Sequence, residues 1–286
     1  MWNLPRSVLN FAQENLGLRH KRTVHLEGGL GSQILGAIYF WNLLDTMPEG
    51  KVGCNLSYFK NSTVGILLRP WALDSFGIPI TEFQKYEKLS RYSSLLSKKD
   101  YLTEQEIEAN YWETARTKYL DRFSFSQDYL IGYFNSRLNL DLHNDYTAVH
   151  IRRGDYLQVA SLLISVENYA DLLNSIEPLL SKEIVFVSDS PLHEQEIVML
   201  TEAVGPDRKS HFLDSPDIDP FAAHCLLRNS TILVCANSTF SFTAGLLGKI
   251  GQSVFSPLNF HAGRGSQKYN NTLRLPSSFT LWPRRN

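Results

Sequence analysis

Two adjacent arginines in the stretch 150–156, HIRRGDY, have the side chains best suited to chemistry in this chain. A guanidinium group matches two phosphate oxygens at once, so Arg152 and Arg153 at a strand end could clamp a pyrophosphate. Strand alternation points His150 and Arg152 to one side and Arg153 to the other. Asp155 could hold an arginine or His150 in position. The alternative is an Arg–Asp surface ion pair, which contributes little energy.

A second candidate is the glycine-rich stretch 28–33, GGLGSQ, which follows a predicted strand. Gly28, Gly29 and Gly31 permit positive φ and a close approach of backbone N–H groups to a ligand, and Gln33 ends the motif. The helix predicted after them presents unpaired N–H groups to an anion. The spacing matches neither a Walker motif nor G-x-G-x-x-G, so it does not indicate a dinucleotide cofactor. A purely structural tight turn is the alternative.

A third candidate is the hydroxyl-rich stretch 236–243, ANSTFSFT, where a predicted strand gives way to a helix. Hydroxyl groups together with the N–H groups of a helix start suit a phosphate. Simple capping of the helix by Asn237, Ser238 or Thr239 is the alternative.

The elements that must position these stretches alternate between strand and helix. Short strands are predicted at 23–26, 147–151, 183–187 and 231–236, and helices at 34–44, 166–180, 192–204, 220–228 and 240–247. Between about 81 and 127 the pattern is helical and polar. Such alternation predicts an α/β fold with a parallel sheet covered on both faces, where ligands bind at the strand ends. The break near 140–146 is the predicted boundary between domains 1–145 and 146–286.

Composition narrows the class of protein further. The chain has 286 residues, 43% of them hydrophobic, and a formal net charge of −1, which does not indicate a nucleic-acid partner. Cys54, Cys225 and Cys235 lack the spacing of a disulfide framework or zinc site, and a reducing cytoplasm fits them. The sequence predicts no transmembrane helix. Residues 1–18 could form an amphipathic helix with at most peripheral membrane contact, and a packed surface helix is the alternative.

Taken in order, the three stretches resemble those of bacterial-type α-1,2-fucosyltransferases, within the wider fucosyltransferase superfamily. The resemblance runs from Gly28 to about Leu247, and residues 150–156 match the family signature fully. The family's glycine motif ends in Asn-Gln, whereas this chain has Ser32-Gln33. Its last motif ends in two tryptophans, whereas this chain has Phe242-Thr243.

The resemblance implies a GT-B fold, with two Rossmann-like domains facing a cleft and the C-terminal one holding GDP-fucose. It implies inverting transfer of L-fucose to a glycan hydroxyl, the 2-OH of galactose in this family, with no metal or other cofactor. Arg152 would hold the β-phosphate and promote departure of the leaving group. The remaining donor contacts that it implies come from Ser238, Thr239 and Phe240 around the pyrophosphate and from Asp189 or Asp219 at the ribose or guanine.

The sequence also offers candidates for a general base and one possible metal-binding motif. Glu27 and His25, beside the glycine turn, are candidate bases, although Glu27 could only cap or pair locally. Asp217 and Asp219 form an Asp-x-Asp between two prolines, away from the strand ends where such motifs hold metals, so no metal is predicted. The rival hypotheses are transfer of another GDP-sugar and an inactive nucleotide- or glycan-binding module. Oligomeric state is not indicated.

Overall fold

The computed structural model describes residues 22–60, 69–87, 111–135, 137, 142, 145–158, 162–257, 276 and 278–282. The chain forms two compact units, Met1–Thr103 and Glu104–Asn286, and each is described by itself. The amphipathic helix predicted at 1–18 lies outside the described residues, as does the part of the predicted polar stretch between 88 and 110. No helix in the described part of the chain is long and apolar enough to cross a membrane.

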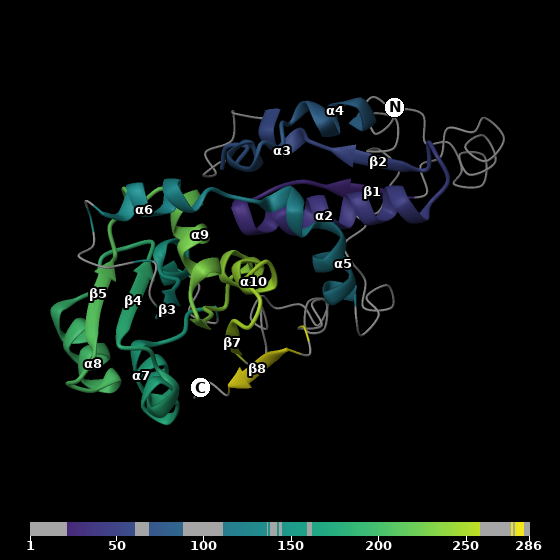
Figure 1. The fold of residues 1–286 in the computed structure, drawn as a ribbon. Coiled ribbons are helices and arrows are strands. Elements are labelled where there is room, and N and C mark those ends of the chain that lie inside the picture. The colour runs from purple at the N-terminus through teal and green to yellow at the C-terminus, as the bar shows by residue number, and fades with distance from the viewer. Residues whose placement is uncertain are drawn as a thin grey trace. The chain divides into compact units, whose positions relative to one another are not determined.

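The first unit contains a β-α-β element built around the glycine turn (Figure 1). Strand β1 (Arg22–His25) pairs in parallel with β2 (Val52–Asn55), and helix α2 (Leu30–Thr46) connects them. Helix α2 is apolar along most of its length and largely buried, so it forms the core of this unit. Helices α3 (Ser57–Lys60) and α4 (Thr81–Glu87) and the 3-10 turn η1 (Leu73–Phe76) follow. The predicted strand, glycine turn and helix are confirmed.

The second unit begins earlier than the predicted boundary at 145/146. It includes α5 (Tyr111–Tyr119), the 3-10 turn η3 (Leu120–Phe123) and α6 (Gln127–Asn135). Hydrogen bonds hold this segment to the later chain: Arg228 Nη1 donates to the Phe123 carbonyl over 2.6 Å, and Arg116 Nη2 donates to the Gly248 carbonyl over 2.8 Å. By packing, the described residues 111–135 therefore group with the C-terminal sheet.

The sheet of the second unit has six strands, all parallel, in the order β5-β4-β3-β6-β7-β8. This is the strand order of a Rossmann sheet, in which the second and third strands lie on one side of the first strand and the fourth to sixth strands lie on the other. The order therefore reverses between the first and fourth strands, which here are β3 and β6. The strands are β3 (Tyr146–Ile151), β4 (Glu183–Ser188), β5 (Lys209–Leu213), β6 (Ile232–Val234), β7 (Ser253–Pro257) and β8 (Phe279–Trp282).

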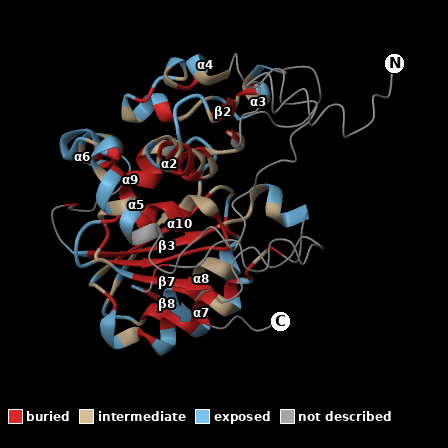
Figure 2. Ribbon diagram, turned by 90° about the vertical axis from the view of Figure 1, so that its right-hand side faces the viewer, coloured by how far each residue is buried: buried red, intermediate tan, exposed pale blue. Residues whose placement is uncertain are grey.

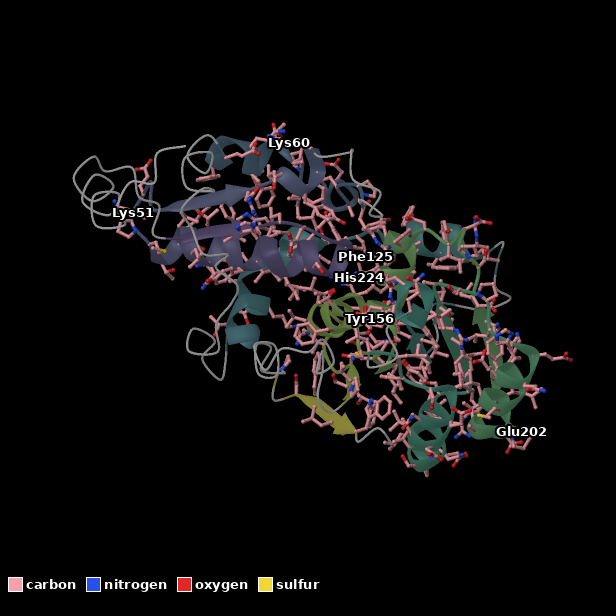
Figure 3. All side chains as sticks on the ribbon, turned by 180° about the vertical axis from the view of Figure 1, so that it is seen from behind. Lys51, Lys60, Phe125, Tyr156, Glu202 and His224 are labelled. Carbon is pink, nitrogen blue, oxygen red and sulfur yellow. The ribbon has the colours of Figure 1, made fainter. Side chains whose placement is uncertain are left out.

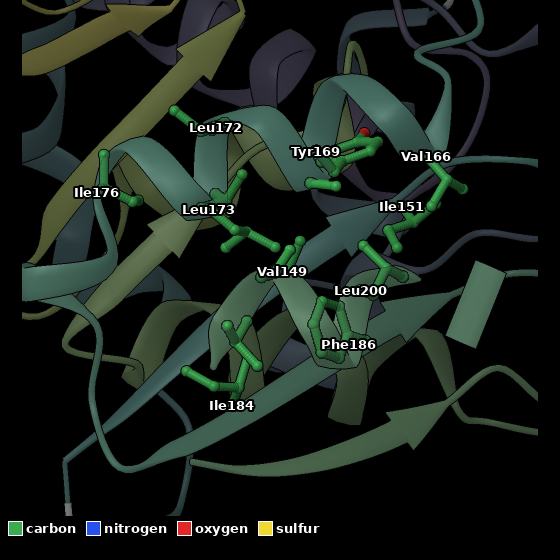
Figure 4. Packing of buried hydrophobic residues seen from close by; sticks show 14 of the residues in the cluster. Val149, Ile151, Val166, Tyr169, Leu172, Leu173, Ile176, Ile184, Phe186 and Leu200 are labelled. Atoms are coloured by element: carbon green, nitrogen blue, oxygen red, sulfur yellow. The ribbon is translucent and has the colours of Figure 1, made fainter. Parts of the chain in front are cut away.

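Helices cover both faces of this sheet. On one face α7 (Val166–Ser175) and α8 (Glu194–Val204) pack over a hydrophobic cluster that includes Val149, Ile151 and Phe186 (Figure 4). On the other face lie α9 (Pro220–Asn229) and α10 (Thr239–Leu246). Every residue of β3 is buried, and this strand runs through the centre of the unit (Figure 2). A run buried on both faces is typical of a central parallel strand.

The predicted α/β class with a parallel sheet is thus confirmed. The long helix predicted over 166–180 is shorter, because Pro178 follows Ser175 closely and the chain continues as the 3-10 turn η5 (Glu177–Leu179). Strands β2, β5, β7 and β8 were not predicted. All three cysteines are buried and free, as expected for residues of the hydrophobic core.

Candidate functional site

The carboxyl ends of β3 and β6 flank the point where the strand order of the sheet reverses. Open α/β sheets bind their ligands at this point, outside the carboxyl ends of the strands. Arg152 and Arg153 follow β3 directly, Asp189 follows β4, and Asn237 to Phe240 follow β6 at the start of α10. The two most specific predicted stretches are therefore adjacent in the fold, because β3 and β6 are neighbouring strands.

Arg152 is held between two carboxylates. Its Nη1 forms an ion pair with Asp189 Oδ2, and its Nη2 donates to Asp155 Oδ1 over 2.5 Å. The guanidinium also lies over the ring of Tyr156, with Cζ 5.1 Å from the ring centroid. The Arg152 side chain is 15% exposed, and its buried Nε–H has no hydrogen-bond acceptor in the described part of the chain. Arg152 is thus held through both terminal nitrogens, and its Nε–H is unused.

Arg153 points to the opposite face, as strand alternation predicts. Its Nη1 pairs with Glu196 Oε1 over 2.5 Å, and Glu196 belongs to the capping box at the start of α8. Its backbone N–H donates to Asp189 Oδ1 over 2.8 Å. The side chain of Arg153 therefore ties the β3 loop to α8, and of the two guanidinium groups only that of Arg152 lies on the His150 side.

Asp189 joins the loops after β3 and β4. One of its carboxylate oxygens accepts the Arg153 N–H and the other pairs with Arg152. Gly154 has a φ of +28°, and a Cβ at this position would overlap the Asp189 carboxylate. A residue without a side chain is needed here so that the carboxylate can approach the backbone. Both carboxylate oxygens of Asp189 thus have partners within the protein, and its contact with the ribose or guanine stays a prediction.

His150 is a buried, neutral histidine on the α9 and α10 face of β3. Its ring lies against Phe240, with centroids 5.3 Å apart, and Phe240 in turn meets His224 edge to face at 5.2 Å. Burial, with a smaller contribution from the charge of Arg152, lowers the pKa of His150 to about 3. Its Nδ1 is buried and has no hydrogen-bond partner among the residues that the structure describes. A group with so low a pKa is a weak proton acceptor, so His150 does not fit the role of general base.

His224 is the second buried histidine of this face, and it explains one departure from the family pattern (Figure 3). Its Nε2 lies 3.1 Å from Thr243 Oγ1, and burial holds its pKa well below the usual range. The Thr243 hydroxyl is also within hydrogen-bond distance of the Thr239 and Phe240 carbonyls. Phe242 is fully buried and packs against Phe279. The departures at 242 and 243 thus lie in the packing behind the start of α10.

The residues at the start of α10 have mainly local partners. Ser238 is the N-cap, and its side chain accepts from the Phe240 N–H over 3.3 Å. Asn237 is buried and its Nδ2 lies 3.3 Å from the Leu162 carbonyl. Thr239 is the first residue of the helix, whose first turn contains no acidic residue. The local electrostatics therefore favour an anion at this helix start.

Asp219 is the N-cap of α9. Its Oδ1 accepts the Phe221 N–H over 3.1 Å, its Oδ2 accepts the Tyr129 hydroxyl over 2.6 Å, and its N–H donates to the Tyr133 hydroxyl over 2.7 Å. Asp217 is exposed. No group of three or more histidine, cysteine or acidic side chains suited to a metal occurs among the described residues. Metal independence stays a prediction.

In the first unit, Gln33 shapes the glycine turn. Its Nε2 donates to the carbonyls of Gly28 and Pro70, each over 2.9 Å, and its Oε1 accepts the Ala72 N–H over 2.8 Å. Gln33 is fully buried, so these bonds tie the turn to the segment before η1. The arrangement gives Gln33 a positioning role within the loop, and its predicted contact with the donor stays a prediction.

The three glycines of this turn have different structural roles. Gly28 has a φ of +79°, which only glycine adopts readily. Gly29 is the N-cap of α2, and the exposed Arg69 side chain lies beside it. Gly31 is buried inside the first turn of α2. The turn therefore has a structural need for glycine at position 28 whatever it binds.

The two candidate bases lie on either side of Leu26. Glu27 is half-buried, and its carboxylate has no hydrogen-bond or ion-pair partner among the described residues, so local capping does not account for it. His25 ends β1, with Nδ1 3.3 Å from Asn55 Nδ2. Of the two candidate bases, Glu27 is therefore the one whose carboxylate oxygens are not engaged by any described residue.

Three residues of the site were missed in the sequence. Glu196 holds Arg153, Ser190 accepts the Gly154 N–H over 3.2 Å, and His224 contacts Phe240. Glu196 could have been found from its position three residues after His193, the spacing of a capping box. No sequence pattern indicates His224, which lies 74 positions after His150 and meets the same ring through the fold.

Comparisons with known proteins add little to this geometry. No protein-family model matches the chain, and no curated protein matches it. Among solved structures, a glycosyl transferase family 9 protein from Veillonella parvula DSM 2008 aligns at a TM-score of 0.46 and 12% identity, over 94% of this chain and 88% of that one.

POFUT1 in complex with GDP-fucose aligns at a TM-score of 0.43 and 12% identity, over 92% of this chain and 98% of that one. POFUT1 in complex with GDP aligns at 0.42 and 13%, over 80% and 95% of the two chains. TM-scores below 0.5 at such identities carry no argument about function. The case for a function therefore rests on the residues and geometry of this chain.

Proposed function

We propose that this protein is a glycosyltransferase that transfers a sugar from a GDP-sugar donor, L-fucose by the family resemblance, to a hydroxyl group of a glycan. One observation carries the proposal: Arg152, which follows β3 on the His150 side, and the start of α10 flank the reversal point of a Rossmann sheet. A cationic fork and a helix N-terminus are both suited to a diphosphate. The proposed acceptor position is the 2-OH of galactose.

In the proposed reaction, the nucleoside diphosphate of the donor is the leaving group. The acceptor hydroxyl oxygen attacks the anomeric carbon from the face opposite the phosphate, so a C–O bond forms as the sugar–phosphate bond breaks, and the configuration inverts. Negative charge develops on the β-phosphate oxygen, where Arg152 and the helix start stabilise it without a metal ion. The acceptor proton goes to a general base, and we propose Glu27 for this role because its carboxylate lies beside the glycine turn and has no partner among the described residues.

His150 has a supporting role in this proposal. Its neutral ring fixes Phe240 at the start of α10 and lies two residues before Arg152 on the same side of β3. A charged imidazolium at this position is disfavoured by burial and by Arg152 itself. His150 therefore helps to set the spacing between the arginine and the helix start.

The test is a donor screen with GDP-fucose, other GDP-sugars, UDP-sugars and dTDP-sugars, with the glycosidic product mapped for each active donor. Replacing Arg152 by Ala should lower kcat by about 100-fold or more, as removal of one transition-state donor does elsewhere. The matched control is Arg122→Ala, an exposed arginine of η3. Turnover that survives Arg152→Ala unchanged would exclude the assigned role, and abolition of activity by EDTA would exclude a metal-independent reaction.

The same screen decides between the proposed function and its rivals. Activity with a different GDP-sugar would make fucose the wrong donor while leaving the role of Arg152 intact. GDP binding without turnover of any donor would identify an inactive nucleotide-binding module.

A further inference from the structure

The two carboxylates that pair with Arg152 give the proposed phosphate site a net negative charge. Arg152, Asp155 and Asp189 together carry one positive and two negative charges, while Arg153 is paired with Glu196. A site with a net negative charge repels a diphosphate. Exchange of one carboxylate partner of Arg152 for the phosphate would remove part of this repulsion.

The surroundings of the two carboxylates differ. Asp189 is 29% exposed, accepts the Arg153 N–H with its other oxygen and packs against Gly154, so it is anchored at both oxygens. Asp155 is 50% exposed, and Arg152 is its only hydrogen-bond or ion-pair partner in the part of the chain that the structure describes. It lies in the short turn η4 (Gly154–Gln158). Solvent screens the half-exposed Asp155 carboxylate, which weakens its pairing with Arg152, so Asp155 is the partner that leaves at the lower cost.

The atoms involved show what its departure would free. Asp189 holds Nη1, Asp155 holds Nη2, and Nε is buried and unpartnered. Nε and Nη2 lie along one edge of the guanidinium plane, where they form a two-pronged donor for a carboxylate or a phosphate. Asp155 uses only one prong of that edge. A phosphate in its place could use both, while Asp189 continued to orient the group through Nη1.

We propose that Asp155 and a phosphate of the donor compete for the same position on Arg152, and that the donor diphosphate displaces Asp155 from it. The inference rests on the proposed function and deepens it. Asp155 is then a counter-ion that makes binding selective, because a small anion gains too little to replace it. A nucleoside diphosphate gains the free edge of Arg152 and the start of α10 together. No proton is transferred in the exchange: Nη2 changes its partner from Asp155 to the phosphate, and Nε gains one.

The test compares binding of GDP and of inorganic phosphate to four forms of the full chain by isothermal titration calorimetry. The forms are wild type, Asp155→Asn, Asp155→Ala and Asp207→Asn. Asp207 is an exposed aspartate before β5, at the other end of the strands, so its replacement makes the same change in net charge away from the site. The thermal midpoint of each form reports whether it folds.

Both Asp155 variants should bind GDP about tenfold more tightly than wild type, because the competing ion pair and the repulsion of one carboxylate are removed. They should also bind inorganic phosphate, for which wild type and Asp207→Asn show no measurable affinity. Weaker or unchanged GDP binding by the folded Asp155 variants would overturn the proposal and make Asp155 a fixed support of Arg152. That result would leave the proposed function standing if wild type binds GDP. Failure of every form to bind GDP would instead overturn the proposed function, and the inference with it.

Discussion

The buried histidine of β3 leads to a quantitative prediction about stability. In the folded protein burial and the neighbouring Arg152 lower the pKa of His150 from 6.5 to about 3. The unfolded chain therefore binds a proton at this residue between pH 6.5 and pH 3, whereas the folded protein does not. Because the unfolded state binds more protons in this window, stability is complete above pH 6.5 and falls as the pH is lowered towards 3.

The size of the effect follows from the same two pKa values. A shift of one pKa unit corresponds to about 1.4 kcal/mol. A pH of 5 lies about 1.5 units below the pKa of the unfolded imidazole, which is then protonated, whereas the folded imidazole is still neutral. His150 alone should therefore cost the folded state about 2 kcal/mol between pH 7.5 and pH 5. His224, whose pKa is also lowered by burial, acts in the same direction.

The assay is urea unfolding at pH 7.5 and at pH 5, comparing wild type with His150→Phe. Phenylalanine keeps an aromatic ring against Phe240 and cannot titrate, so the variant should lose about 2 kcal/mol less free energy of unfolding than wild type between the two pH values. The matched control is His193→Asn, which removes an exposed imidazole and retains a capping side chain. Equal losses in wild type and His150→Phe would refute the conclusion that His150 is buried and neutral.

Three further predictions concern the loops that position the site. Gly154→Ala should lower the free energy of unfolding by about 1–3 kcal/mol in urea denaturation, because position 154 has a positive φ and its Cβ would overlap Asp189; unchanged stability would contradict this geometry. Gln33→Leu should cost about 3 kcal/mol by the same assay, since three part-buried backbone groups lose their partners at about 1 kcal/mol each, whereas Gln33→Glu should retain only the bond from Ala72. Ser238→Ala should cost about 1 kcal/mol through loss of the α10 cap, and Ser238→Asp, which retains a capping oxygen, should recover that stability while weakening GDP binding through its added charge; tighter GDP binding by Ser238→Asp would argue against a phosphate at this helix start.

Much of the second unit was predictable from local pattern. Strand β3 is a buried apolar run followed by arginines, and β4, α8, α9, β6 and α10 lie within a few residues of their predicted positions. Strands β5 and β7 were missed because Lys209–Leu213 and Ser253–Pro257 carry polar residues or proline at positions that pair within the sheet. Their strand conformation depends on hydrogen bonds to β4 and β6, partners that are distant in sequence.

The sequence predicted which residues lie at the candidate site better than it predicted their contacts. The order of the three stretches pointed to Arg152, and alternation along β3 correctly separated it from Arg153. The partners of these arginines could not be predicted, because Asp189 and Glu196 come from other elements and reach the β3 loop only through the packing of β4 and α8. The same holds for Gln33, which looked like a ligand contact and is bonded to its own loop and to residues 70 and 72.

The sequence by itself determined the α/β class and the types of side chain at each strand end, because strand and helix periodicities and glycine turns are local properties of the chain. Only the tertiary structure decided the strand order that brings β3 beside β6, and with it the adjacency of Arg152 and the start of α10. It also decided the protonation state of His150 and the pairing of Arg152 with two carboxylates. Burial and charge pairing depend on groups that the chain brings together from distant positions, so no local pattern can specify them.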